Sequence, residues 1–111
     1  MNTNSKVIGR LAPSPTGFLH LGNAWAFFLA WLGVRSRGGK LVLRMEDIDP
    51  VRSRPEYTAA IMEDLQWLGL DWDGEVYTQS RRLGLYEQAI AEFKAKGLVY
   101  PCYCTRKELR E

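Results

Sequence analysis

The chain has 111 residues, of which 46% are hydrophobic and 25% charged, and its formal net charge is +2. This length predicts one domain, and the composition is that of an ordinary soluble globular chain. A charge so near zero gives no argument for nucleic-acid binding by the whole surface. Any contact with RNA would need a local basic patch, such as Arg35/Arg37/Lys40 or Arg52/Arg54.

Targeting and membrane signals are not recognisable in the sequence. The longest apolar stretch covers residues 24–34, whereas a helix that spans a bilayer needs about 20 apolar residues. The N-terminus lacks the basic region and small-residue cleavage site of a secretory signal. We therefore expect no membrane association and a cytoplasmic location.

The first two expected strands flank an apolar helix. Residues 7–12 are predicted to form a short buried strand that two prolines end, because proline cannot donate to a β-ladder. Asn23 is the expected N-cap of a helix that runs to about residue 37. Apolar residues cover nearly the whole circumference of this helix, so we expect further protein to cover it on most sides. Residues 40–45 are predicted to form the second strand.

Two further helices are predicted after the second strand. Ser53 and Glu56 have the spacing of a capping box, and Gly69 is the expected end of the helix that follows them. Ser80 is expected to cap another helix, which Gly97 ends.

The end of the chain completes the expected order of elements. Residues 98–104 are expected to be extended, and residues 105–111 to begin a last helix. The order strand, helix, strand, helix, helix, strand predicts an α/β fold with a mostly parallel sheet. We expect residues 1–111 to be the first half of a nucleotide-binding domain.

Residues 9–23 form the most informative segment of the chain. They combine an apolar run, a turn rich in Pro, Ser, Thr and Gly, and a His-x-Gly step directly before the apolar helix. Such an arrangement offers backbone N–H groups and a helix N-terminus to phosphates. A His-x-Gly step alone is weak evidence, but the whole fifteen-residue string is much more specific. It resembles the signature of the glutamyl branch of class I aminoacyl-tRNA synthetases.

The resemblance implies a Rossmann-like parallel sheet that binds ATP with Mg²⁺ as a substrate. His20 would contact an ATP phosphate and stabilise the charge that builds on the transferring phosphorus. Asn23 stands where the class has a second histidine, and its amide can donate a hydrogen bond but cannot become cationic. The ATP-binding residues implied are Pro13, Thr16, Gly17, His20, Gly22 and Asn23.

Arg10 and Glu46 follow two neighbouring strands and are the expected glutamate ligands. A guanidinium at the end of a buried strand needs a partner. That partner is either the carboxylate of Glu46 or Asp47, or a carboxylate or phosphate of a ligand. The resemblance implies that Arg10 binds the side-chain carboxylate of L-glutamate and that Glu46 binds its α-ammonium group. It also implies glutamate contacts at Leu11, Ala12 and Ser14.

Two groups of residues could hold a metal. Glu46, Asp47 and Asp49 could bind one or form a polar turn, and the turn is the default expectation. Cys102 and Cys104 are too close in sequence for an unstrained disulfide, and they supply two of the four ligands that zinc normally takes. Two inert thiols explain them equally well. The resemblance implies a zinc site whose remaining ligands lie farther along, so this chain alone would bind zinc weakly or share it.

Three passages, residues 46–52, 72–76 and 98–106, resemble a compact branch of the family. Its members attach glutamate to queuosine at the wobble position of tRNA(Asp). This implies a monomeric ligase that uses L-glutamate, ATP and tRNA(Asp) bearing queuosine. One alternative is a glutamyl-tRNA synthetase that charges the tRNA 3′ end.

The other alternative is a noncatalytic remnant that binds nucleotide. The family's second ATP-binding loop and its later glutamate-binding residues have no counterpart in these 111 residues. The isolated chain is therefore expected to be inactive.

Overall fold

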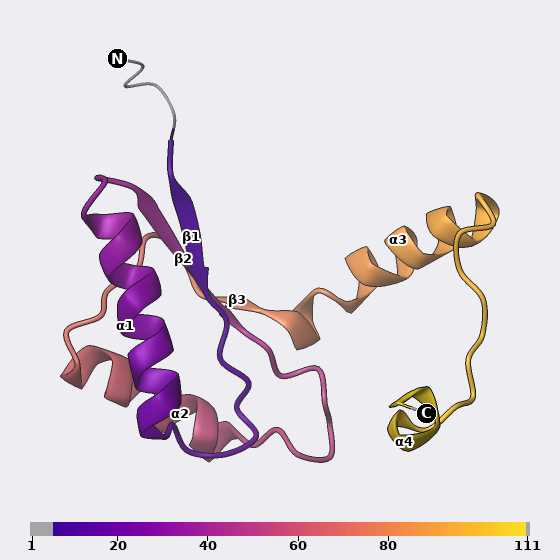
Figure 1. Cartoon of the computed structure of the whole chain (residues 1–111), viewed down its shortest axis with the longest axis horizontal. Coiled ribbons are helices and arrows are strands. Elements are labelled where there is room, and N and C mark those ends of the chain that lie inside the picture. The colour runs from indigo at the N-terminus through magenta and orange to yellow at the C-terminus, as the bar shows by residue number, and fades with distance from the viewer. Residues whose placement is uncertain (1–5, 111) are drawn as a thin grey trace. The chain divides into compact units, whose positions relative to one another are not determined.

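The computed structural model describes residues 6–110, which divide into an N-terminal unit ending at Arg81 and a C-terminal unit beginning at Arg82. The N-terminal unit alternates strands and helices (Figure 1). In chain order its elements are β1 (Ile8–Leu11), α1 (Leu21–Arg35), β2 (Lys40–Met45), α2 (Pro55–Trp67), β3 (Tyr77–Thr78) and a 3-10 turn, η1 (Gln79–Arg81).

The sheet has three parallel strands in the order β1-β2-β3. Arg10 pairs with Val42 across the first two strands, and Arg44 pairs with Tyr77 across the second and third. The predicted α/β class and parallel sheet are confirmed, and β2 covers the predicted residues 40–45. The carboxyl ends of β1 and β2 therefore lie at the same edge of the sheet.

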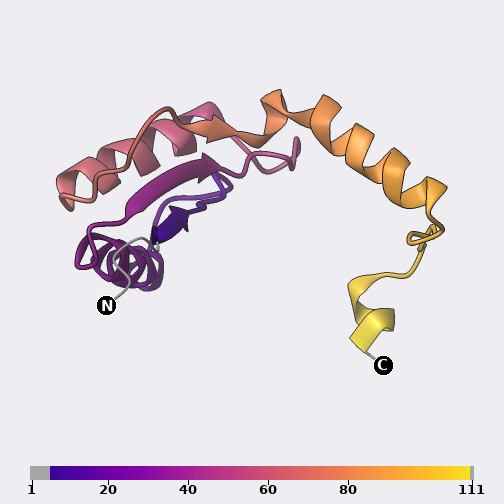
Figure 2. The same cartoon turned by 90° about the horizontal axis from the view of Figure 1, so that it is seen from above.

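The core of the N-terminal unit lies against one face of β2. Leu41, Leu43 and Met45 alternate along the strand and are buried, whereas Val42 and Arg44 between them are only half-buried. The cluster is completed by Leu11 of β1, Val34 of α1, Ile61 and Leu65 of α2, and Leu70. Both helices therefore contribute to this core, and Figure 2 shows the ribbons of α1 and α2 near β2.

Two glycines permit the close approach of α1 and the strands. A Cβ atom at Gly9 would collide with the Val34 side chain. A Cβ atom at Gly39 would collide with the backbone carbonyl of Val7, which accepts a 2.8 Å hydrogen bond from the Lys40 N–H. Side chains at either position would push apart the elements that position the carboxyl ends of the strands.

The outward face of α1 is apolar and exposed. Trp25 is 61% exposed, and the rings of Trp25, Phe28 and Trp31 stack in sequence with centroids 6.0 and 6.3 Å apart. We expected further protein to cover this helix on most sides, but within residues 6–110 only its inward face is covered. The apolar circumference therefore did not predict the packing of this helix in the described part of the chain.

The start of α2 differs from the predicted capping box. The N-cap is Arg54, which donates no side-chain cap, and the Ser53 hydroxyl is buried without a hydrogen-bond partner. Pro55 explains the difference, because a residue before proline is restricted to extended backbone. Arg54 has φ −134° and ψ 142°, so the helix can begin only at the proline itself.

The third strand is also not where the sequence predicted it. Residues 98–104 form no strand, and β3 lies instead between α2 and the helix that begins at Leu83. Ser80, the expected cap of the third helix, lies in η1, and that helix begins after Arg82 without a side-chain cap. A two-residue strand has too short a pattern to be recognised from sequence.

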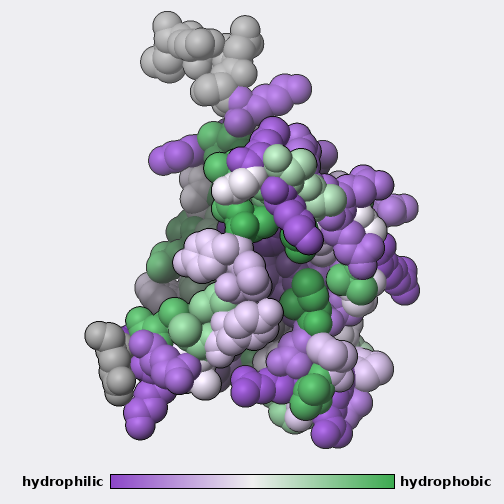
Figure 3. All heavy atoms as spheres, turned by 90° about the vertical axis from the view of Figure 1, so that its right-hand side faces the viewer, coloured by the Kyte–Doolittle hydropathy of each residue, from purple (hydrophilic) through white to green (hydrophobic). Residues whose placement is uncertain are grey.

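The C-terminal unit contains α3 (Leu83–Ala95) and α4 (Arg106–Arg110), both near their predicted positions. No residue of either helix is buried, and apolar residues such as Ile90 and Phe93 are exposed. Figure 3 shows hydrophobic residues, in green, exposed between hydrophilic residues, in purple, on one face of the molecule. No helix in the described range is long and apolar enough to cross a membrane.

Candidate functional site

His20 is the N-cap of α1 and shapes the centre of the candidate site. Its Nδ1 atom accepts hydrogen bonds from the backbone N–H groups of Gly22 and Asn23, at 3.1 and 3.3 Å. The predicted N-cap, Asn23, was therefore wrong. The N-cap is His20, and α1 begins at Leu21. An acceptor at Nδ1 places the proton of the neutral imidazole on Nε2. The second ring nitrogen is thus left as a hydrogen-bond donor.

Asn23 is the reciprocal member of the cap. Its Oδ1 atom accepts a 3.2 Å hydrogen bond from the His20 N–H, which completes a capping box. The side-chain amide nitrogen keeps its donors. Gly22 stands close to the imidazole, since a Cβ atom there would lie 3.0 Å from the ring. Both residues therefore help to orient His20.

A cavity of about 390 Å³ opens beside His20. Its lining includes seven of the residues predicted to bind ATP or glutamate, which come from the loop before α1 and from the start of α1. The predicted residues among the lining are Ala12, Pro13, Ser14, Thr16, Gly17, His20 and Asn23. Leu11 differs, because its side chain lies in the core and only its backbone could meet a ligand.

The loop that lines the cavity is fixed by backbone hydrogen bonds from the rest of the sheet edge. The Glu46 N–H donates to the Pro13 carbonyl at 2.9 Å, and the Arg54 N–H donates to the Pro15 carbonyl at 3.1 Å. The ends of β1 and β2 thus stay joined beyond the last strand residues. Positions 10 and 46, predicted to bind opposite ends of glutamate, are brought to one edge.

Arg10 and Glu46 do not pair with each other. Arg10 is exposed on the sheet face opposite the core, and it forms no ion pair with any residue in the described range. Glu46 accepts a 2.7 Å bond from Arg44 Nη2. The structure therefore leaves Arg10 available for an external anion.

The neighbouring acids each have a partner of their own. Asp47 accepts bonds from the backbone N–H and the hydroxyl of Ser80, at 2.9 and 2.7 Å. Asp49 accepts from the N–H groups of Val51 and Arg52 and so closes a turn. Of the two interpretations of this acidic segment, the geometry favours the polar turn.

Several site residues were missed from sequence. Phe18, Leu19 and Phe27 line the cavity, and Phe18 is held by an edge-to-face contact with Tyr57 at a centroid distance of 4.9 Å. Arg44, the partner of Glu46, was read only as a strand residue. Phe27 was one of the apolar residues that cover nearly the whole circumference of α1, and nothing in the sequence distinguished it from its neighbours.

The cysteines give no support for a metal site. Cys102 and Cys104 are exposed free thiols, and no three metal-binding side chains gather anywhere in residues 6–110. Two thiolates do not complete the four-ligand set of zinc. The residues present therefore do not fit this metal, and no chemical step is assigned to it.

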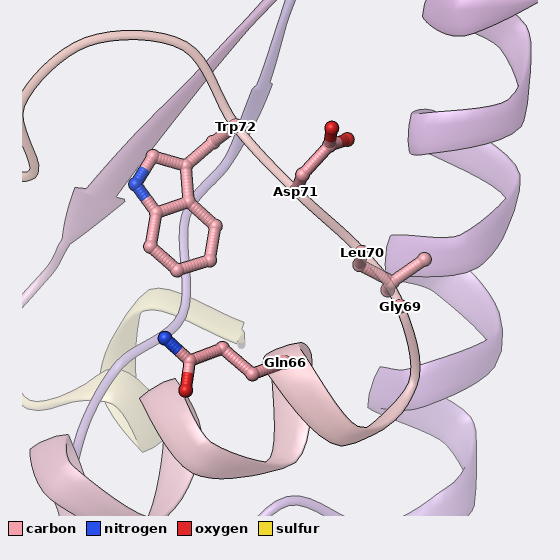
Figure 4. Close-up of a pocket in the computed structure, with 5 residues that line it drawn as sticks. All are labelled: Gln66, Gly69, Leu70, Asp71 and Trp72. Atoms are coloured by element: carbon pink, nitrogen blue, oxygen red, sulfur yellow. The ribbon is translucent and has the colours of Figure 1, made fainter.

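A second cavity, of about 330 Å³, lies at the other end of the sheet. Figure 4 shows the Gln66 side chain pointing toward the Trp72 ring across it, while Asp71 points elsewhere. The Asp73 N–H donates to the carbonyl of Leu41, near the start of β2. Because ligands of open α/β sheets bind at the carboxyl ends of strands, this cavity is the weaker candidate.

Charged side chains near that cavity join α1 to the segment that follows α2. Arg35 bonds Asp71 at 3.1 Å and Asp73 at 2.8 Å, and Asp71 also accepts from the Trp31 indole at 2.7 Å. The hydrogen bond from Arg35 lowers the pKa of Asp73, and that from Trp31 lowers the pKa of Asp71. Asp73 raises the pKa of Arg35 in turn. This member of the Arg35/Arg37/Lys40 patch is thus engaged in structural ion pairs.

The sequence is similar to those of known proteins over nearly the whole chain. Residues 6–111 match the family described as the catalytic domain of class I tRNA synthetases (E and Q). A glutamyl-Q tRNA(Asp) synthetase of Nitratidesulfovibrio vulgaris is 62% identical over 110 residues. A glutamate–tRNA ligase of Thermosynechococcus vestitus is 61% identical over 100 residues.

Solved structures give the same result. A glutamate tRNA ligase from Elizabethkingia meningosepticum, in complex with its amino acid, superimposes with a TM-score of 0.81 at 34% identity. The match covers 96% of this chain and 23% of that one. The two sequence relatives are matched over 92% and 90% of this chain, but only 34% and 21% of their own lengths. The chain thus spans about a third or less of the length of these relatives.

Proposed function

Because the chain belongs to the catalytic-domain family of class I tRNA synthetases (E and Q), we propose that it contributes the ATP- and glutamate-binding edge of an enzyme that makes glutamyl-adenylate. The observation that carries this proposal is His20. One ring nitrogen is fixed by the start of α1, and the other remains a donor beside a 390 Å³ cavity. A fixed donor at a helix N-terminus suits a phosphate.

In the proposed reaction, a carboxylate oxygen of glutamate attacks the α-phosphorus of ATP. A new P–O bond forms, the bond to the β-phosphate bridging oxygen breaks, and pyrophosphate leaves with that electron pair. Mg²⁺ accompanies ATP as part of the substrate. This displacement needs positioning and charge stabilisation more than a nucleophilic side chain. His20 Nε2–H and the backbone around Gly17 and Gly22 would supply them.

Glutamate would be held between the ends of β1 and β2. The unpaired guanidinium of Arg10 would bind the side-chain carboxylate, since arginine matches a carboxylate bidentately. Glu46 would bind the α-ammonium group through the oxygen that Arg44 does not contact. Ala12 and Ser14, which line the cavity, would contact the body of the amino acid. The spacing of opposite charges would select an acidic amino acid.

We further propose that the acceptor is queuosine in tRNA(Asp), and that the enzyme acts as a cytoplasmic monomer. This assignment draws on the three passages that resemble the compact branch and on the relative named glutamyl-Q tRNA(Asp) synthetase. Transfer to a tRNA 3′ end is the second candidate, since a glutamate–tRNA ligase is 61% identical.

The test is glutamate-dependent exchange of pyrophosphate into ATP by the native polypeptide that carries this sequence. Exchange without tRNA is expected, followed by transfer of labelled glutamate to tRNA(Asp) with queuosine but not to tRNA(Asp) with guanosine at the same position. Transfer to the 3′ end of tRNA(Glu) would select the second candidate. No glutamate-dependent exchange would refute both.

The 111 residues alone are expected to show little or no exchange. If the isolated chain exchanges pyrophosphate at the rate of a complete enzyme, the proposed dependence on further family elements is wrong. If the native polypeptide has the 12.7 kDa mass of this chain and is inactive, the noncatalytic alternative takes precedence.

A further inference from the structure

Two arginines and one glutamate share the edge of the sheet, and only one of the two possible ion pairs forms. Arg44 Nη2 lies 2.7 Å from Glu46 Oε1. Arg10 pairs with no described acidic residue, although Glu46 was one of its two expected partners. In the structure, Glu46 is thus paired with Arg44 and not with Arg10.

The backbone places both arginines on one face of the sheet, near the end of β2 that precedes Glu46. Arg10 is registered with Val42, and side chains alternate along β2, so Arg10 and Arg44 emerge from the same face. Strand spacing and rise put their Cα atoms about 8 Å apart. The Glu46 N–H is bonded to the Pro13 carbonyl, three residues after Arg10, so the carboxylate cannot move far from β1.

Burial favours the pair that forms. The side chains of Arg44 and Glu46 are 31% and 29% exposed, so water screens their attraction only partly. Arg44 nevertheless leaves its Nε–H buried without a hydrogen-bond partner. A buried donor left unsatisfied is unfavourable for stability, which makes a purely stabilising role for Arg44 a poor explanation.

We propose that Arg44 is a positioning residue that separates Glu46 from Arg10. By holding one carboxylate oxygen of Glu46, it leaves the other for an ammonium group and leaves the Arg10 guanidinium for a carboxylate. Without Arg44, Glu46 turns to Arg10 and neutralises it, and both binding groups are lost together. The identity of the ligand, a zwitterionic acidic amino acid, rests on the proposed function.

The first test needs no ligand. In the ¹⁵N-labelled native polypeptide that carries this sequence, Arg44→Gln is expected to shift the Arg10 Nε–H resonance and slow its exchange with water at least threefold, because Glu46 now pairs with Arg10. The double variant Arg44→Gln/Glu46→Gln is expected to restore the parent signal. Arg44→Lys keeps a cation at position 44 and should leave the signal unchanged, as should the control Arg52→Gln.

The second test uses glutarate, which has two carboxylates but no ammonium group, as the titrant. Arg44→Gln is expected to weaken glutarate binding at least tenfold, although Arg44 is not its ligand, and the added Glu46→Gln substitution to recover most of that loss. Unchanged Arg10 signals in Arg44→Gln, or a loss that Glu46→Gln does not reverse, would overturn the proposal. If the signals move as expected but neither glutarate nor L-glutamate binds, the positioning role stands and the proposed ligand is wrong.

Discussion

Substitution of His20 separates its role as a helix cap from its proposed role as a phosphate donor. Nδ1 accepts two backbone N–H groups of α1, so alanine at this position leaves both without their partner. Loss of an N-cap costs about 1 kcal/mol. Asparagine is among the best N-cap residues, so His20→Asn should cost only a few tenths of a kcal/mol. Neither substitution keeps a ring donor in the cavity.

Stability and activity should therefore respond differently to the two variants. With a urea dependence of about 1 kcal/mol per M for a small unit, His20→Ala should lower the unfolding midpoint of the chain by about 1 M. His20→Asn should leave the midpoint nearly unchanged. Both should reduce pyrophosphate exchange by the native polypeptide about 10²- to 10³-fold, the usual effect of losing one preorganised donor.

Comparison of the two variants makes the reasoning refutable. Circular dichroism during urea unfolding gives the midpoint, and initial rates at saturating ATP and glutamate give the exchange activity. Full exchange activity in His20→Asn would show that the histidine acts only as a cap. A large loss of stability in His20→Asn would show instead that the two N–H bonds do not account for its structural role.

Three further outcomes follow from the packing and the charges. Gly39→Ala should destabilise the chain by about 1–3 kcal/mol, because the new Cβ meets the Val7 carbonyl. Gly33→Ala, which adds the same atom to open space on a helix, should be neutral or stabilising by up to about 1 kcal/mol; equal effects in urea unfolding would contradict the steric argument. Asp73→Asn should lower the urea midpoint at pH 7. Because Arg35 lowers the pKa of Asp73 below its ordinary value of 3.8, the native state gains stability above that pH and loses it as the pH falls through the lowered pKa. The parent and variant midpoints should therefore begin to converge as the pH falls below 3.8 and meet only below the lowered pKa, and a difference that persists there would exclude ionisation as its cause.

The strongly patterned elements of the fold were predictable from sequence. Apolar residues alternate along residues 40–45, and two acidic residues follow them. The strand β2 occupies these residues, with every second side chain buried. The segment before α1 was placed at the strand end, where the cavity is found. Both features depend on local sequence alone, namely hydrophobic periodicity and the inability of proline to continue a ladder.

The remaining features depend on contacts between distant residues. The pairing of Arg44 with Tyr77 makes a strand of two residues that carry no pattern of their own. Ser80 was expected to cap a helix, but its hydroxyl finds Asp47, 33 residues earlier in the chain. His20 was missed as a cap because the usual N-cap residues are Ser, Thr, Asp and Asn, although an imidazole nitrogen accepts the same N–H groups. The partner that each of these residues finds in the folded chain therefore determined its structure, and the local sequence did not reveal that partner.

Arg10 also lies on a sheet edge, which has a consequence for handling the protein. In the described sheet β1 pairs only with β2, so the other side of this strand presents unpaired backbone N–H and C=O groups. Such edges promote association between copies, and a charged side chain on the edge strand opposes it. Arg10→Ala therefore removes a barrier to self-association as well as the proposed ligand contact. Sedimentation velocity of that variant over a range of concentrations is needed before any loss of glutamate binding is assigned to the missing guanidinium.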